Sequence, residues 1–248
     1  MNETSHLANA PILEAVIDIR ANLKRKIEKG DLPEIKERFK DEFPILKEII
    51  TFGGKISFSE NEKTPTVEDG NRALLGYRLD SQDGKHILQI RNNGYTFSRL
   101  HPYTNWDEVK SLAMNYWSWF KSFREITNIS RLAVRYINRI VLPFPVNDLS
   151  EYFTAPPSLP EGVSQPLESF FTKVTVAYPD KDVSANIVQA FEKADEKHGV
   201  QIILDIDVYS TREDFDEAEV WSFFENLKII KNQIFSCSVQ KKTLEMFK

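Results

Sequence analysis

"RLAVRYINRI", Arg131–Ile140, is a run of strand-forming residues that carries three arginines in a chain of net charge −5. Successive side chains of a β-strand point to opposite faces, so Leu132, Val134 and Tyr136 share one face while the arginines share the other. The more apolar face is expected to meet the core. The stretch therefore predicts a half-buried strand whose second face carries Arg131, Arg135 and Arg139.

Two other segments show the same pattern. "ILEAVIDIR" (Ile12–Arg20) alternates with Ala15, Ile17 and Ile19 on its apolar face, and "VQIILDIDVY" (200–209) does so with Ile202 through Val208. Each has charged residues on its second face. Across the three strands we expect one polar sheet surface, whose candidate binding residues are Glu14, Asp18, Arg20, Arg135, Arg139, Asp205 and Asp207.

Two long amphipathic helices are predicted at Thr104–Ile126, where Asn105 and Glu108 resemble a capping box, and at Asp216–Phe235. Shorter helices are expected at Asp31–Phe43 and Asn147–Phe153. Turn residues separate further strands, which are predicted at Ala73–Ser81, Lys85–Arg91, Gly94–His101, Glu168–Tyr178 and Val183–Glu192. "ILKEIITFGGKISFS" (45–59) fits either a helix or a strand pair, and Glu60–Asn71 is expected to be a polar loop.

The order of these elements repeats along the chain. Each half runs strand, helix, loop, three strands and long helix, although the halves share little sequence. We therefore predict an α+β fold made of two similar β-α-β-β-β-α halves, with an antiparallel sheet and long helices packed on one face. The halves, about 11–128 and 129–248, would form a single domain.

Composition limits the classes of protein that this chain can belong to. Its 248 residues are 41% hydrophobic and 28% charged, which is ordinary for a globular protein. Its one cysteine permits neither a disulfide within the chain nor a cysteine-based zinc site, which fits the cytoplasm. No apolar run reaches the roughly 20 residues of a membrane span. The acidic balance argues against general nucleic-acid binding.

A family resemblance is carried by "NAPILEAVIDIR", "LLGYRLDS", "YTNWDEV" and "RLAVRYINRIVLP" together. The chain resembles a sporadically distributed bacterial family of uncharacterised proteins of about this length, from Asn9 to the helix that ends near Phe235. The resemblance implies a bacterial origin, and the patchy distribution is similar to that of defence or mobile-element genes. It assigns no catalytic residue.

The charged sheet face supports three interpretations. It is either a solvated surface of ion pairs that contribute little, or a groove in which Arg135 and Arg139 hold an anion. In the third interpretation Asp205 and Asp207 hold Mg²⁺ or Mn²⁺ in a phosphate-handling enzyme. The clustered Glu-x-Glu-x-Lys pattern of triphosphate-processing tunnels is absent, because "EAVIDIR" has Glu-x3-Asp-x-Arg.

We therefore expect a non-enzymatic binding protein for a protein partner or a small anionic ligand, with no cofactor. An accessory, immunity or antitoxin-like role in a defence or mobile-element cassette would fit the resemblance. The metal-dependent phosphate-handling enzyme is the alternative. At the C-terminus, "QKKTLEMF" (240–247) predicts a short helix that packs Leu244 and Phe247 on the body or on a second copy, as in a homodimer.

Overall fold

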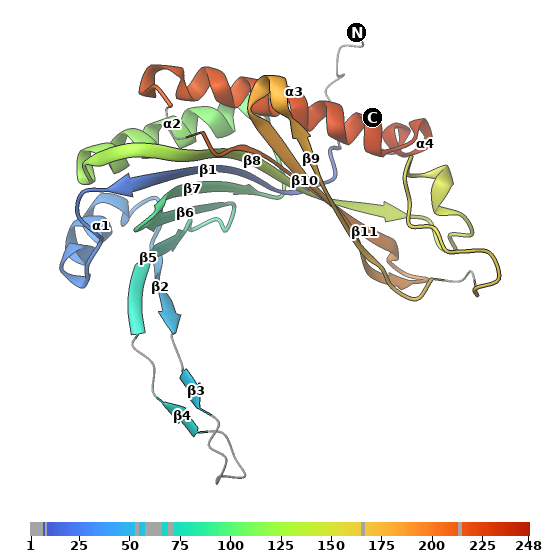
Figure 1. The fold of residues 1–248 in the computed structure, drawn as a ribbon, viewed down its shortest axis with the longest axis horizontal. Coiled ribbons are helices and arrows are strands. Elements are labelled where there is room, and N and C mark those ends of the chain that lie inside the picture. Colours follow the sequence, from blue (N-terminus) through green and yellow to red (C-terminus); the bar gives the residue numbers. More distant parts are fainter. Residues whose placement is uncertain are drawn as a thin grey trace.

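Nine strands form one antiparallel sheet in the computed structural model of this chain (Figure 1). The structure describes residues 7, 9–52, 55–57, 66–68, 72–164, 167–212 and 215–248. The strands of this sheet are β1 (Ile12–Leu23), β2 (Ile45–Phe52), β5 (Arg72–Asp80), β6 (His86–Arg91), β7 (Gly94–Leu100), β8 (Ile126–Leu142), β9 (Phe171–Tyr178), β10 (Val183–Asp195) and β11 (Gly199–Ser210). A separate pair consists of β3 (Lys55–Ser57) and β4 (Thr66–Glu68).

The order of the strands places the N-terminal strand beside the strand that opens the second half of the chain. The order is β2-β5-β6-β7-β1-β8-β11-β10-β9, and every neighbouring pair is antiparallel. β1 and β8 are therefore central strands. The free edges of the sheet are β2 and β9.

The α-helices are α1 (Leu32–Phe39), α2 (Trp106–Phe123), α3 (Val220–Ser238) and α4 (Lys241–Glu245). Figure 1 shows α2 and α3 along the upper side of the sheet, which curves beneath them. α2 contacts β7, and α3 contacts β8 and β11. No helix of the described residues is long and apolar enough to cross a membrane.

The core lies between the sheet and these helices. Ile17 of β1 is opposite Val134 of β8, and Ile19 is opposite Leu132, and all four are fully buried. On the α2 side, the Tyr95 hydroxyl donates to the carbonyl of Ala113 at 3.0 Å. The face of the sheet opposite α2 and α3 is the open face, and it carries Asp18, Arg131, Arg135, Asp205 and Asp207 by the same alternation.

Several local predictions need correction. The segment at 45–59, which fitted either a helix or a strand pair, forms strands β2 and β3 in its described part, but β2 pairs with β5 and β3 with β4. β4 lies within the predicted loop Glu60–Asn71, of which the remainder lies outside the described residues. Asn147–Phe153 contains only the single 3-10 turn Leu149–Glu151, because the Asp148 side chain accepts from the Ser150 amide and closes the turn locally.

The expected C-terminal helix is present as α4, and it packs on the body of the same chain. Phe247 is buried, and its carbonyl accepts a hydrogen bond from the Asn9 amide at 3.0 Å. Leu244 lies against the hydrophobic core. The segment that follows α3 therefore contacts the residues just before β1.

Candidate functional site

The arginines of strand β8 lie on the open face because the apolar side chains on its other face are buried in the core. Leu132 and Val134 are fully buried beneath the helices, and Tyr136 is nearly so. The pairing of β8 with β1 and β11 sets Arg131 opposite Arg20 and sets Arg135 opposite Val16 and Asp207. The period-2 argument from the sequence therefore places these side chains correctly.

Asp18 of β1 is the centre of the open face, where three guanidinium groups converge on its carboxylate. Arg91 donates from Nη2 to Oδ1 at 2.6 Å, and Thr96 donates from its hydroxyl to the same oxygen at 2.6 Å. Arg20 Nε and Arg131 Nη1 each donate to Oδ2 at 2.9 Å. Both carboxylate oxygens are thus saturated, although Asp18 is only 7% exposed.

The electrostatics of Asp18 follow from this geometry. Burial by itself would raise the pKa of Asp18, but the charges of Arg91, Arg20 and Arg131 and the Thr96 hydrogen bond more than offset burial and lower it. Burial also lowers the pKa of Arg91, although the Asp18 charge opposes that shift. Arg91 Nε is buried and has no hydrogen-bond partner among the described residues. The cluster is a compact and strongly cationic environment around one carboxylate.

A chain of polar contacts extends from Asp18 across the sheet. Arg131 continues from Asp18 to Asp207, to which its Nη2 donates at 2.9 and 3.1 Å. Asn186 donates from Nδ2 to Asp207 Oδ2 at 3.4 Å, and its Oδ1 accepts a hydrogen bond of 2.8 Å from the Thr175 hydroxyl. The members lie on β6, β7, β1, β8, β11, β10 and β9. We call this chain the polar belt, which consists of Arg91, Thr96, Asp18, Arg20, Arg131, Asp207, Asn186 and Thr175.

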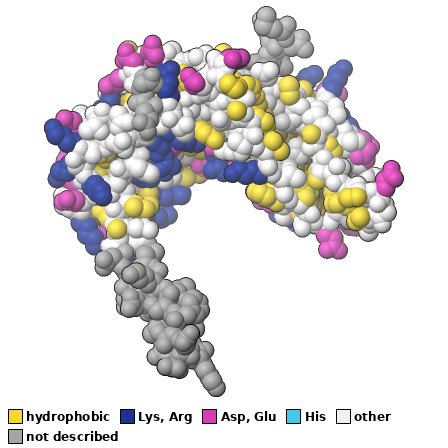
Figure 2. Space-filling view, in the orientation of Figure 1, with side chains coloured by type: hydrophobic (Ala, Val, Ile, Leu, Met, Phe, Trp, Pro, Cys, Tyr) yellow, Lys and Arg dark blue, Asp and Glu magenta, His cyan; other side chains and the backbone are white. Residues whose placement is uncertain are grey.

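The other two arginines of β8 form separate pairs beside the polar belt. Arg135 binds Asp205 through two bonds of 2.9 and 2.6 Å, and Arg139 binds Glu192 through two bonds of 2.6 and 2.8 Å. The hydrogen bond to Asp205 raises the pKa of Arg135. Figure 2 shows Lys and Arg side chains gathered on the hollow underside of the molecule.

The structure brings together only some of the residues that the sequence singled out. Asp18, Arg20 and Asp207 meet through Arg131, whereas Arg135 with Asp205 and Arg139 with Glu192 stand apart. Glu14 lies on the same face and raises the pKa of Arg135 slightly through its charge, as the last of the causes that act on that group. No ion pair of the described residues includes Glu14.

The suggested metal pair is not arranged to share an ion. Asp205 is bound by Arg135 and Asp207 by Arg131, so different guanidinium groups occupy the two carboxylates. Among the described residues, no group of three or more His, Cys, Asp and Glu side chains is placed to hold a metal ion. The carboxylates that the Mg²⁺ or Mn²⁺ interpretation requires are therefore already paired with arginines.

The polar belt also contains residues that were not among the sequence candidates, namely Arg91, Thr96, Arg131, Asn186 and Thr175, although the sequence did place Arg131 on this face. Alternation in "HILQIR" separates Arg91 from Leu88 and Ile90, so its face could be assigned from the sequence. Its position next to Asp18 depends on the register of β6 on β7 and of β7 on β1. A single sequence does not reveal that register.

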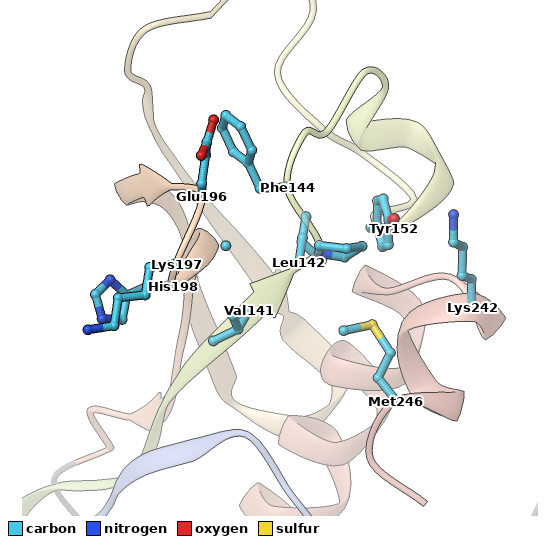
Figure 3. A pocket seen from close by; sticks show the side chains of 11 residues that line it. Val141, Leu142, Phe144, Tyr152, Glu196, Lys197, His198, Lys242 and Met246 are labelled. Carbon is cyan, nitrogen blue, oxygen red and sulfur yellow. The ribbon is translucent and has the colours of Figure 1, made fainter.

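One hollow in the described part of the chain lies away from the polar belt, at the end of β8. It encloses about 610 Å³ between Phe144, the turn before β11 and α4 (Figure 3). Lys242 is paired with Glu151 and His198 is hydrogen-bonded to Asp195, whereas no ion pair of the described residues includes Glu196 or Lys197, which also line the hollow. The remaining wall is mostly apolar, with Val141 and Met246 partly exposed.

Comparison with known proteins adds no functional assignment. A scan against models of protein families finds no match to this chain, and a search of curated protein sequences finds none. No substrate, partner or site residue therefore comes to this chain by likeness to a relative.

Proposed function

We propose that this chain is a non-enzymatic binding protein, and that the polar belt holds an anionic group of a small ligand or of an acidic partner. The observation that supports this is the convergence of Arg20, Arg91 and Arg131 on Asp18. With Asp207 included, three guanidinium groups face two carboxylates. The belt therefore has an excess positive charge in a chain whose net charge is −5.

Pre-organisation makes these arginines suitable for binding. A free arginine loses side-chain entropy when it grips an anion, whereas hydrogen bonds to a buried carboxylate already hold these side chains in place. Arg20 uses its Nε for Asp18, and its terminal nitrogens have no hydrogen bond to a described residue. Its side chain is 32% exposed. Those two nitrogens match the oxygens of a carboxylate or phosphate.

The remaining carboxylates of the open face restrict the type of anion. Asp205, Glu192 and Glu14 alternate with Arg135 and Arg139 along the flank of the polar belt. A long polyanion laid along β8 would meet these negative charges, which favours a short anionic group over a nucleic-acid backbone. The proposal therefore does not include general nucleic-acid binding.

Calorimetric titration of the full chain with pyrophosphate and with a glutamate-rich peptide tests this proposal. Arg20→Ala should weaken binding of the preferred probe at least tenfold, because it removes the exposed donors of the cluster. Arg78→Ala is the matched control, since Arg78 lies on the same face on β5 and pairs with Asp80 outside the polar belt. Equal affinities in the two variants, or no heat with either probe, would contradict the proposal.

We also infer that the chain is a single domain of two pseudo-repeats, about 11–128 and 129–248. The order of the strands supports this, because in each half the strand before the long helix, β7 or β11, pairs with the first strand of that half, β1 or β8. The two halves then meet through β1 and β8, and each contributes one long helix to the same side. The free thiol of Cys237 suits a cytoplasmic setting, and a place in a bacterial defence cassette depends on the family resemblance alone.

A further inference from the structure

Strand β9 forms an edge of the nine-stranded sheet that no described residue covers. It has eight residues, of which Lys173 is the only charged one. Phe171 is 70% exposed and Val174 is 55% exposed. A long and partly apolar edge strand with a single charged residue is a template for pairing with another strand, and proteins normally protect such edges with several charges.

The opposite edge of the sheet is protected in the usual way. Strand β2 places Lys47 and Glu48, both exposed, in the middle of its length. Lys47 is bound to Asp80 of the neighbouring strand. Charged residues on an edge strand discourage pairing with a further strand. The two edges of the sheet therefore differ in the number of charged residues, which is two on β2 and one on β9.

The free backbone groups of β9 can be identified from its pairing with β10. The Phe191 amide donates to the Phe170 carbonyl at 3.0 Å, so even-numbered residues of β9 face β10 in the alternating ladder. The odd-numbered residues then turn their N–H and C=O groups outward. These are Phe171, Lys173, Thr175 and Ala177, and all four are exposed.

We propose that β9 pairs antiparallel with β9 of a second copy, about a two-fold axis at Val174. In this register Phe171 lies opposite Ala177 of the second copy and Lys173 lies opposite Thr175, so all four outward-facing residues form hydrogen-bonded pairs. No like charges are directly opposite. The two Val174 side chains meet in a non-hydrogen-bonded pair, where side chains approach most closely.

This pairing has a consequence for the open face. Thr175 is the last member of the polar belt, and Lys173 of the second copy would be its cross-strand neighbour. The two polar belts would then meet at the axis with a lysine added on each side. The pairing depends on the edge strand and not on ligand binding. A test of the pairing is therefore independent of a test of the proposed function.

Light scattering during size-exclusion chromatography tests the assembly. The full chain should approach about 57 kDa, twice its mass of 28.7 kDa, as its concentration rises. Thr175→Pro should remain a monomer, because it removes an outward N–H and leaves the bonds to β10 in place. Thr175→Val is the matched control and should still dimerise. Circular dichroism would show that both variants are folded.

Disulfide trapping tests the register. In a Cys237→Ser background, Val174→Cys should cross-link two chains on oxidation, because the two copies of residue 174 are directly opposite. Val176→Cys should not, because in this register it lies about 13 Å along the strand from its own copy. A chain that stays at 28.7 kDa at high concentration, a dimer that persists in Thr175→Pro, or equal cross-linking of both cysteine variants would overturn the proposal.

Discussion

A cation lies on each side of strand β8, and the two cations are compensated in opposite ways. On the open face Arg131 lies between Asp18 and Asp207. On the helix side Lys231 of α3 is only 8% exposed, and its Nζ lies 3.7 Å from the centre of the Tyr136 ring. No ion pair of the described residues joins Lys231 to a carboxylate. One cation is compensated by charge, and the other only by an aromatic face.

This contrast sets the expected energetics of the two sites. A buried charge with its counter-charge is near balance, and removing one partner leaves a costly unpaired ion. A buried charge without a counter-ion is already costly. Burial, with a smaller contribution from the charge of Lys228, lowers the pKa of Lys231 to about 7. Removing the carboxylate charge of Asp18 from the open face should therefore destabilise the folded protein. Removing the charge of Lys231 on the helix side should stabilise it.

The largest effect is expected from Asp18→Asn. The change leaves Arg91 and Arg131 together without their shared carboxylate, and we expect it to lower the free energy of unfolding by about 3 kcal/mol. Urea denaturation would measure the loss. Asp205→Asn is the matched control, because its partner Arg135 is more exposed, and it should cost about 1 kcal/mol or less. Equal losses would show that Asp18 is not a special centre of the open face.

The pH dependence of Asp18 provides a second measurement on the same variant. Its folded pKa is lowered, so the charged carboxylate contributes stability above the unfolded value of 3.8, and that contribution is lost as pH falls through the folded pKa. The acid limb of the stability profile should accordingly be shallower in Asp18→Asn than in the parent chain.

The second effect has the opposite sign. Lys231→Met replaces the unpaired buried cation with an apolar side chain of similar length, and we expect a gain of about 2 kcal/mol at neutral pH. In the parent chain the unfolded state holds a proton at this site up to about pH 10.5, whereas the folded state releases it near pH 7. Stability from this group therefore rises with pH between those values.

Lys231→Met should lack this increase of stability with pH. Between pH 7 and pH 10, the urea midpoint of Lys231→Met should rise less with pH than the midpoint of the parent chain does. A matched change at Lys228→Met, on the same helix but more exposed and paired with Glu225, should reduce the slope only slightly, because it removes the smaller of the two causes that lower the pKa of Lys231. A destabilised Lys231→Met with an unchanged pH slope would show that the ring contact to Tyr136 outweighs the cost of burial.

The sequence predicts which face of each strand holds these groups, but not which groups meet. Alternation alone places Leu132 and Arg131 on opposite sides of β8, since one apolar face must be buried. It cannot give the pairing of β8 with β1, which includes bulges that shift the register near Arg20. The contact between Arg131 and Asp18 joins residues 113 positions apart. Such contacts depend on the strand order of the whole sheet.

Lys231 illustrates a different limit. In "NLKIIKNQIF" (226–235) it reads as an ordinary polar position on a long helix, and only the placement of α3 over Tyr136 buries it. Helical periodicity does locate Leu227 and Ile234 on the core side, and both are buried. A lysine between them can direct its amine outward or inward, and the sequence pattern does not distinguish these orientations.

A smaller effect is expected where the charge is kept but the geometry is lost. Arg131→Lys retains one positive charge, but an ammonium group cannot reproduce the fork that reaches both Asp18 and Asp207. We expect a loss of about 1 kcal/mol, measured by urea denaturation. Arg20→Lys serves for comparison, because Arg20 contacts a single carboxylate through one bond, and it should cost less. Equal costs would mean that bridging two carboxylates adds nothing to stability.

The smallest effect is expected at the end of β8. Arg139 and Glu192 form a two-bond pair, but both side chains are about one-third exposed, so solvent and salt screen their attraction. Arg139→Gln should change the free energy of unfolding by no more than about 0.5 kcal/mol. A double-mutant cycle with Glu192→Gln would isolate the coupling between the two side chains. A coupling above about 2 kcal/mol would show that the open face is shielded from solvent along all of β8, and the contrast between its centre and its flank would disappear.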